Sequence, residues 1–307
     1  MNGVTLKHLR YFEALASHGH FGRAAAACAI SQPALSVQIK ELEALLGMAL
    51  VERGKKRIGL TAFGADVAAR ARRIVQSVDE LGDLARASAG AFAGELRLGL
   101  IPTIAPYLFP AIFERVTARF PGLDLRPREA VTGKLIDDLR AGVLDAAIVA
   151  LPVSEPTLTE LALFEEEFVL IRPICDVDAP APGPEQLADM RLLLLEEGHC
   201  FRAQALAFCN RTARPPRDLI EGGSLSTLVQ MVGAGIGVTL IPDMALTLEM
   251  RSATLAAVGL PAPRPTRTVG MIWRATNPLA AQFLEVARLV REAGEEARQA
   301  SLALARR

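Results

Sequence analysis

Apolar residues recur every three or four positions through the first 47 residues of the chain. This spacing predicts a helix that ends at the breaker segment 17–20, followed by a short helix over 21–28 with a face of small residues. Ser31 can cap a third helix, which ends at Gly47. The buried stripe of that helix consists of Leu35, Ile39, Leu42 and Leu46. Short helices joined by a tight turn predict a helix-turn-helix.

Two further elements follow the third helix. Segments 48–53 and 57–60 are typical of short strands around a basic turn, so the first 60 residues are expected to form a winged helix-turn-helix domain dominated by helices. Thr61 can cap a long linker helix over 61–89. Its apolar positions alternate at three and four residues, and they are Ala71, Ile74, Val78, Leu81 and Ala85. This coiled-coil seam predicts a homodimer that binds a two-fold related DNA site.

From residue 90 to residue 307, predicted strands alternate with predicted helices, which indicates an α/β domain with a parallel sheet. The strands lie at 95–100, 123–128, 146–150, 168–174, 192–195, 238–241 and 268–273, and the helices at 107–120, 135–141, 225–234 and 278–297. Because the last strand and helix return to the first half, two lobes are expected, 95–164 plus 268–300 and 165–267. Ligands of open sheets bind beyond the strand ends, where Thr103 and Thr132 lie.

The composition is ordinary for a water-soluble globular protein, with 51% hydrophobic and 22% charged residues among 307. No apolar stretch is long enough to span a membrane. The N-terminus leads directly into a helix, without the pattern of a signal peptide. These features predict a cytoplasmic protein with no membrane partner, in which the four cysteines are free thiols unless they are redox-active.

Charge is unevenly distributed along the chain. Residues 1–89 contain 12 Lys and Arg against 8 Asp and Glu, whereas the remainder contains 22 against 26. The basic end is therefore the candidate for binding double-stranded DNA. The groups at the start of the third helix that would read base edges are Ser31, Gln32, Pro33, Ser36, Gln38 and Lys40. The wing residues that would contact phosphates are Arg53, Lys55 and Lys56, for which plain surface charge is the alternative.

Two thiols, Cys200 and Cys209, stand at the ends of one predicted helix that follows Gly198. The apolar face of this helix consists of Phe201, Ala205 and Phe208. On an intact helix the two Cα atoms would be about 13 Å apart, whereas a disulfide requires about 4.4 to 6.8 Å. If the two thiols pair, the helix must unwind, so oxidation would be a conformational switch.

The surroundings of Cys200 favour a reactive thiolate, because His199, Arg202 and the start of a helix lie next to it. The alternative for each thiol is a small buried core residue, which is how we interpret Cys28 on a helix face. Cys175 is expected in a loop. A metal site is disfavoured, because the two thiols and the imidazole have no Cys-x-x-Cys motif or fourth ligand. No cofactor is predicted.

The N-terminal residues resemble the LysR-type transcriptional regulators. The motifs are Phe21-x-x-Ala24-Ala25, Ser31-Gln32-Pro33-Ala34-Leu35-Ser36-x-Gln38-Ile39-x-x-Leu42-Glu43, Leu46-Gly47, Arg53 and Leu60-Thr61-x-x-Gly64. The resemblance implies a winged helix-turn-helix, a dimerising linker helix and a C-terminal effector domain like the two-lobed periplasmic-binding proteins.

The C-terminal half is similar to the hydrogen-peroxide-sensing activators within that family. The matching segments are Leu100-Ile101-Pro102-Thr103-Ile104-x-Pro106-Tyr107-Leu108-x-Pro110, Glu196-Glu197-Gly198-His199-Cys200-x-Arg202-x-Gln204-Ala205-x-x-Phe208-Cys209 and Arg267-Thr268-Val269-Gly270. This likeness implies a peroxidatic Cys200, a resolving Cys209 and a reversible disulfide between them. The implied peroxide pocket consists of Thr103, Thr132, His199, Arg202 and Arg267. Homotetramers and contact with RNA polymerase are further implications.

Two positions depart from the peroxide-sensing pattern. Ala203 stands where an acidic residue is usual, and Phe201 replaces a usual leucine, so peroxide sensitivity is expected to differ. Two other functions remain open at this stage. The first is a LysR-type regulator that responds to a small-molecule effector in the crevice between the lobes, without redox switching. The second is a thiol peroxidase with an N-terminal DNA-binding module, which the absence of Cys-x-x-Cys disfavours, so we expect a regulator and not an enzyme.

Overall fold

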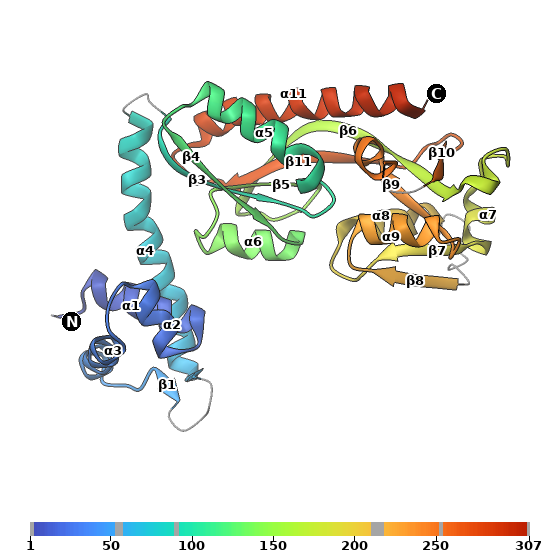
Figure 1. Cartoon of the computed structure of the whole chain (residues 1–307). Coiled ribbons are helices and arrows are strands. Elements are labelled where there is room, and N and C mark those ends of the chain that lie inside the picture. The colour runs from blue at the N-terminus through green and yellow to red at the C-terminus, as the bar shows by residue number, and fades with distance from the viewer. Residues whose placement is uncertain (1–2, 53–57, 89–91, 210–217, 252–253, 306–307) are drawn as a thin grey trace. The chain divides into compact units, whose positions relative to one another are not determined.

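The computed structural model describes residues 3–52, 58–88, 92–209, 218–251 and 254–305 (Figure 1). The chain divides into two compact units, Met1–Ser88 and Ala89–Arg307. In neither unit is any described helix long and apolar enough to cross a membrane.

The first unit is a winged helix-turn-helix followed by a long helix, as predicted. Its elements are α1 (Leu6–His18), α2 (Phe21–Ala27), α3 (Gln32–Leu46), β1 (Val51–Glu52), β2 (Gly59–Leu60) and α4 (Ala62–Ser88). Ser31 caps α3 by accepting a hydrogen bond from the backbone amide of Ala34, and Thr61 accepts one from Gly64 at the start of α4. The predicted stripe of α3 forms the core, with Leu35, Ile39 and Leu42 buried. β1 and β2 are antiparallel and shorter than the predicted strands.

Helix α4 carries an apolar stripe on its surface. Ala71 is buried within the unit, whereas Ile74, Val78, Leu81 and Leu84 are exposed to between 37% and 64%. An ion pair between Arg10 and Asp79 fastens α1 to α4. The exposed positions include three members of the predicted coiled-coil seam, so the stripe can pack against a second copy of the helix.

The second unit is built on one mixed sheet, which the described residues form in the order β4-β3-β5-β11-β6-β9-β7-β8, with β10 paired to β6. The strands are β3 (Gly94–Leu100), β4 (Leu123–Glu129), β5 (Ala146–Leu151), β6 (Leu158–Pro173), β7 (Arg191–Leu195), β8 (Asp218–Gly222), β9 (Val238–Pro242), β10 (Leu255–Gly259) and β11 (Thr266–Arg274). We call β3 to β5 with their helices the first lobe and β7 to β9 with theirs the second lobe.

The prediction of a parallel sheet is only half right. β3 is parallel to β4 and β5, and β7 is parallel to β8 and β9. Between these groups β11 and β6 run antiparallel to each other and to their neighbours. β6 spans both lobes because it begins at Leu158, ten residues before the predicted strand at 168–174. The run of three consecutive glutamates, Glu165 to Glu167, concealed in the sequence that the strand is continuous across both lobes.

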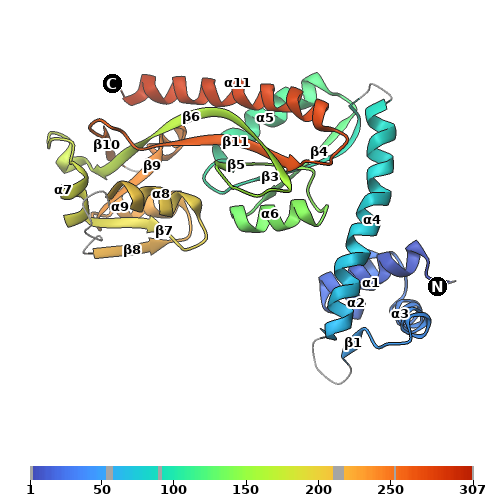
Figure 2. The same cartoon turned by 180° about the vertical axis from the view of Figure 1, so that it is seen from behind.

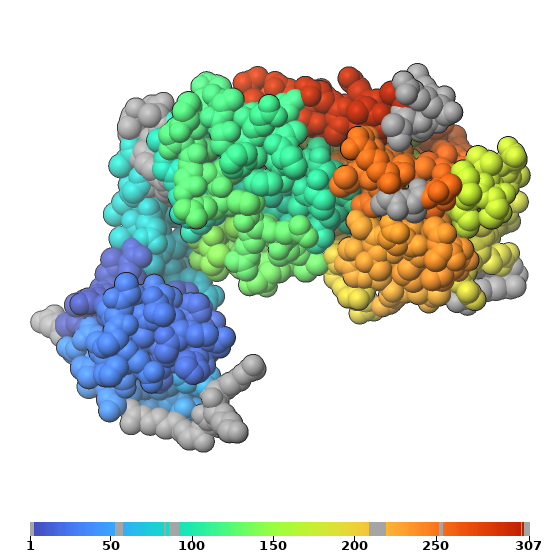
Figure 3. All heavy atoms as spheres, viewed as in Figure 1, coloured from blue at the N-terminus to red at the C-terminus, as the bar shows by residue number. Residues whose placement is uncertain are grey.

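Helices cover the sheet of each lobe. In the first lobe, α5 (Ala105–Arg119) and α11 (Ala280–Ala305) lie on one face and α6 (Thr132–Arg140) on the other (Figures 1 and 2). The second lobe contains α7 (Pro184–Asp189), α8 (Cys200–Cys209) and α9 (Leu225–Gly233), which Ser224 caps as predicted. Two short elements follow β9, namely η3 (Asp243–Ala245) and α10 (Leu246–Glu249). The space-filling view shows first-lobe residues in green beside second-lobe residues in yellow and orange (Figure 3).

Candidate functional site

Helix α8 places Cys200 at its first residue. β7 leads into Gly198, which has φ +96°, a left-handed conformation that glycine adopts at little cost. The chain then enters α8 with Cys200 half-buried. Phe201, Ala205 and Phe208 are buried in the core of the second lobe, so the predicted apolar face is confirmed.

Cys209 is the last residue of α8. Its side chain lies outside the part of the structure that is described. Across nine helical rises of about 1.5 Å, the Cα atoms of Cys200 and Cys209 are about 13 Å apart. That separation exceeds the reach of a disulfide, which needs about 4.4 to 6.8 Å. The helical conformation of α8 is therefore a dithiol conformation.

Arg267 connects the two lobes beside α8. Its guanidinium is fully buried and donates three hydrogen bonds, to Thr103 Oγ1 at 2.7 Å, to the backbone oxygen of Thr103 at 3.1 Å and to Glu166 Oε1 at 2.6 Å. Thr103 follows β3 in the first lobe and Arg267 lies on β11. The structure thus brings together two of the five predicted pocket residues.

Phe201 joins the Cys200 helix to this arginine. The Arg267 guanidinium lies 5.5 Å from the centre of the Phe201 ring, and that ring is 4.7 Å from the ring of Phe168 on β6. A cation over an aromatic face and an aromatic pair each contribute on the order of 1 kcal/mol. The phenyl group of Phe201 therefore fixes the start of α8 against the arginine.

His199 and Thr132 are two further residues of the predicted pocket. Burial lowers the pKa of His199, while the charges of Glu196 and of Glu129 at the end of β4 raise it. The imidazole is therefore neutral at neutral pH, when it can both donate and accept a hydrogen bond. Thr132, at the start of α6, has a buried hydroxyl without a hydrogen-bond partner among the described residues.

Arg202 is engaged elsewhere. It donates a hydrogen bond to the backbone oxygen of Leu195 at 2.9 Å and forms an ion pair with Glu221 on β8 at 2.8 Å. Among the described residues, no hydrogen bond or ion pair joins Arg202 to Thr103 or Arg267. This side chain secures α8 to β7 and β8, which spacing along the sequence could not reveal.

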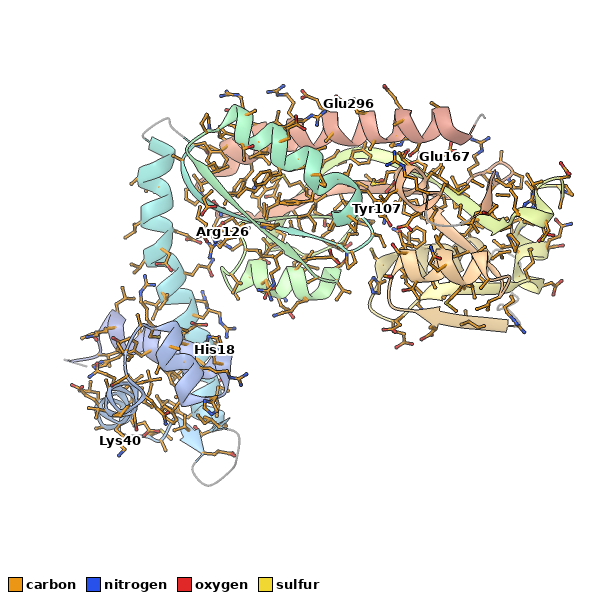
Figure 4. The ribbon with its side chains drawn as sticks, in the orientation of Figure 1. His18, Lys40, Tyr107, Arg126, Glu167 and Glu296 are labelled. Carbon is orange, nitrogen blue, oxygen red and sulfur yellow. The ribbon has the colours of Figure 1, made fainter. Side chains whose placement is uncertain are left out.

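The sequence interpretation missed two polar groups between the lobes, one buried and one partly buried. Glu166, in the middle of the three glutamates, is fully buried beside Arg267. Tyr107 donates a hydrogen bond from its hydroxyl to Glu249 of α10 at 2.7 Å, and Ser226 of α9 donates to the same oxygen at 2.8 Å. Figure 4 shows Tyr107 in the first turn of α5, beside the second lobe. The only sequence signal for Tyr107 was its place after Thr103 in the quoted motif.

Most of the predicted DNA-binding residues lie on one helix. Ser31, Gln32, Pro33 and Lys40 are exposed, and Lys40 projects from α3 away from its domain (Figure 4). Ser36 is half-exposed, and Gln38 donates a hydrogen bond to Glu41 at 3.0 Å. Arg53, Lys55 and Lys56 lie outside the described residues.

The remaining cysteines are separate from this site. Cys28 ends α2 and packs against the core of the first unit, and not within the helix face as predicted. Burial raises the pKa of its thiol. Cys175 lies exposed in a 3-10 turn over Ile174–Asp176. Within the described residues, no group of three or more His, Cys, Asp or Glu side chains could hold a metal ion.

Two family models match the chain. Residues 6–65 match the bacterial regulatory helix-turn-helix proteins of the lysR family, and residues 89–295 match the LysR substrate binding domain. The "Probable hydrogen peroxide-inducible genes activator" of Streptomyces viridosporus is 41% identical over 293 residues, which is 94% of each chain. The "DNA-binding transcriptional dual regulator OxyR" of Escherichia coli K12 is 36% identical, over 94% of this chain and 95% of the other.

Solved structures agree with these relatives. Full-length OxyR from Pseudomonas aeruginosa, determined as a cysteine-to-aspartate variant, matches with a TM-score of 0.78 and 37% identity, over 95% of this chain and 96% of the other. A hydrogen peroxide-bound OxyR mutant from Corynebacterium glutamicum matches with a TM-score of 0.68 and 31% identity, over 98% and 95%. The chain therefore belongs to the LysR family of bacterial helix-turn-helix regulators, and its relatives within that family are the hydrogen peroxide-inducible genes activators.

Proposed function

We propose that this protein is a DNA-binding transcriptional activator that senses hydrogen peroxide through Cys200 and Cys209. The observation that carries the proposal is the position of Cys200, half-buried at the start of α8, one residue from the aromatic ring that packs against Arg267. The relatives named as hydrogen peroxide-inducible activators support the same function over 94% of the chain.

The chemistry takes place in two steps. The Cys200 thiolate attacks one oxygen of the peroxide, the O–O bond breaks, and sulfenic acid forms while the departing hydroxide takes up a proton. Thr103 and His199 can hold the peroxide, and Arg267 stabilises the charge on the departing oxygen. The Cys209 thiolate then attacks the sulfenic sulfur, and hydroxide leaves as the disulfide forms. A thiol reductant reverses the change.

Disulfide formation requires α8 to unwind, because the helix holds the two residues too far apart. A disulfide that closes a loop of about ten residues constrains the chain by roughly 2 to 3 kcal/mol in the loop-entropy model. Refolding of the helix and reburial of Phe201 and Phe208 oppose it. The two conformations can therefore be close in free energy, so that oxidant drives the change in one direction and reductant in the other.

The partners and location follow from the same family. The exposed stripe of α4 supports a homodimer, and α3 would enter the major groove of double-stranded DNA. Homotetramers, contact with RNA polymerase and action in the cytoplasm are part of the proposal. We assign residues 1–60 to DNA binding, 61–89 to dimerisation and 90–307 to sensing.

A map of thiol states tests the proposal. The purified reduced protein is treated with one equivalent of hydrogen peroxide, alkylated under denaturing conditions and analysed by mass spectrometry. We expect a disulfide between the peptides of Cys200 and Cys209, with Cys28 and Cys175 still available for alkylation. If Cys200 and Cys209 stay reduced, redox sensing is wrong, and a small-molecule effector between the lobes becomes the function to test.

A further inference from the structure

Four charged side chains, three of them buried, form a charge network that extends from the predicted peroxide pocket to α11. Arg267 Nε donates to Glu166 Oε1 at 2.6 Å, and Arg298 Nε on α11 donates to Asp243 Oδ2 at 3.1 Å. Glu166 is fully buried and Asp243 is 1% exposed. Between the two arginines, the carboxyl groups of Glu166 and Asp243 act on each other, and each keeps one buried oxygen, Glu166 Oε2 and Asp243 Oδ1, that accepts no hydrogen bond from the described residues.

A hydrogen bond between two carboxyl groups requires a proton on one of them. Glu166 Oε2 and Asp243 Oδ1 receive no hydrogen bond from any other described residue, so the shared proton is the donor available to them. Burial, with a smaller contribution from the neighbouring Asp243, raises the pKa of Glu166 to about 7 against the opposing charge of Arg267. Burial also raises the pKa of Asp243, which Arg298 opposes.

The shared proton determines the charge behind Arg267. With one proton on the pair, the two arginines carry two positive charges against one negative charge. Without it, the four groups are neutral overall. Within the charge network, Arg267 is the residue that donates a hydrogen bond to Thr103 and packs against Phe201, the residue next to Cys200. Its capacity to stabilise a departing hydroxide is therefore greatest while Glu166 is neutral.

We propose that Glu166 and Asp243 share a proton and act as positioning residues for peroxide reduction, because they orient Arg267 and set how much of its charge remains uncompensated. The proposal rests on the proposed function of Cys200. Neither carboxyl group touches the peroxide. Both act through Arg267.

The charged and titratable groups that face the pair come from every element packed around it. β11 contributes Arg267, η3 contributes Asp243 and α11 contributes Arg298. The Tyr107 hydroxyl on α5 and Glu249 of α10 lie close enough to interact, since the charges of Arg267 and Glu249 both act on Tyr107. Burial raises the pKa of Tyr107 well above its ordinary value, so this hydroxyl stays neutral throughout the range considered.

The expected pH dependence follows from these charges. Below pH 7 Glu166 is neutral and leaves Arg267 uncompensated, so each Cys200 thiolate reacts faster. Above pH 7 Glu166 ionises, compensates Arg267 and slows the reaction. The fraction of thiolate rises with pH in every variant, and a ratio of variant to parent rate at each pH removes that common factor.

Two variants separate this role from a structural one. In Glu166→Gln the group beside Arg267 is neutral at every pH. In Asp243→Asn the negative charge beside Glu166 is removed and an amide can donate to it, so Glu166 ionises at a lower pH than in the parent. The first variant should react like the parent at pH 6 and faster at pH 8.5, and the second should react like the parent at pH 8.5 and more slowly at pH 6. We expect differences of about tenfold, below the 10² to 10³ typical of a direct donor.

The experiment uses the full chain with Cys209→Ser as the parent, so that the reaction stops at the sulfenic acid. Stopped-flow kinetics and a dimedone-type probe measure the rate constant with hydrogen peroxide between pH 5.5 and 8.5. Glu167→Gln is the matched control, because Glu167 is the next residue on β6 but is partly exposed and paired with Arg264. This control should follow the parent, and unfolding of each variant is recorded in parallel.

The proposal is supported if the rate constant of Glu166→Gln differs from that of the parent only at high pH and the rate constant of Asp243→Asn differs only at low pH. Parallel profiles, or equal losses at every pH, overturn it. A second measurement does not depend on the peroxide reaction, namely infrared difference spectra of the reduced protein between pH 6 and pH 8.5. A protonated-carboxyl band that is present in the parent and absent in Glu166→Gln establishes the proton-sharing pair. If Cys200 is unreactive although this band is present, the proposed function is wrong and the pair still stands. Absence of that band in the parent refutes the pair.

Discussion

Weakening α8 should make the Cys200–Cys209 disulfide easier to form. Ala203 and Ala207 are exposed residues of this helix, so replacing either with glycine removes little packing. Glycine costs about 1 kcal/mol relative to alanine inside a helix. That cost falls on the reduced protein, in which α8 is intact, and vanishes once the helix has unwound. The reduced state therefore becomes less stable relative to the oxidised state.

The expected shift can be converted to a redox potential. For a two-electron couple, about 1.4 kcal/mol corresponds to about 30 mV. Ala207→Gly should therefore move the midpoint potential by about 20 mV toward more negative values. The pair Ala203→Gly with Ala207→Gly should move it further, by up to about 40 mV, because each glycine adds its own backbone cost to the helical state.

Redox titration provides the assay. The full-length protein is equilibrated in glutathione buffers of graded ratio, and the disulfide fraction is read by alkylation and mass spectrometry. Ala300→Gly is the matched control, since it is an exposed alanine inside α11, which stays helical in the proposed mechanism. If the α8 variants shift no more than this control, α8 does not unwind on oxidation, and the disulfide forms by another movement.

Three further outcomes are expected. Thr103→Val leaves an Arg267 N–H without its acceptor at 2.7 Å. A hydrogen bond to a charged group contributes about 1.5 to 3 kcal/mol, so Cys200 oxidation should slow roughly tenfold to 100-fold. The control Thr117→Val, measured in the same stopped-flow assay, should react like the parent. Leu81→Glu, at a position 64% exposed on α4, should shift sedimentation from dimer to monomer, and Leu248→Glu, 47% exposed in the second unit, should not. Folding raises the pKa of Glu166 from 4.5 to about 7, so the folded state binds more protons than the unfolded state between these pH values. The free energy of unfolding should therefore fall as pH rises from 5 to 7, by about 3 kcal/mol at most. Denaturant titrations at several pH values should show a flatter pH dependence of that free energy for Glu166→Gln, and an unchanged slope would contradict the raised pKa.

The sequence predicted the elements whose signals are local. Ser31, Thr61 and Ser224 cap the helices they were expected to cap, because a cap depends on a hydroxyl and an amide two or three residues away. The buried face of α8 followed from the spacing of Phe201, Ala205 and Phe208 in the same way. Such features need no information about the rest of the chain.

The sequence alone could not predict which residues far apart in the chain would pair. Glu166 reads as part of a solvated acidic run, and its burial depends on Arg267 and Asp243, which β11 and η3 bring from about 100 and 77 positions away. Arg202 was assigned to the pocket because it lies two positions from Cys200, and its ion-pair partner Glu221 comes from the distant strand β8. In each case the partner of the charge decides its role, and only the fold specifies that partner.

Phe201 makes the sensing step and the conformational step depend on each other. Its ring packs against Arg267 and Phe168 while α8 is helical, so the reduced fold supplies both an ordered Cys200 and a positioned arginine. In the proposed mechanism, unwinding α8 withdraws this ring, and Arg267 loses the contact that joins it to the helix. The oxidised protein would then lack the arrangement that favours reaction with peroxide. A phenyl group gives this contact a larger area than a leucine side chain would, so Phe201→Leu should loosen the link between the two steps while leaving both thiols in place.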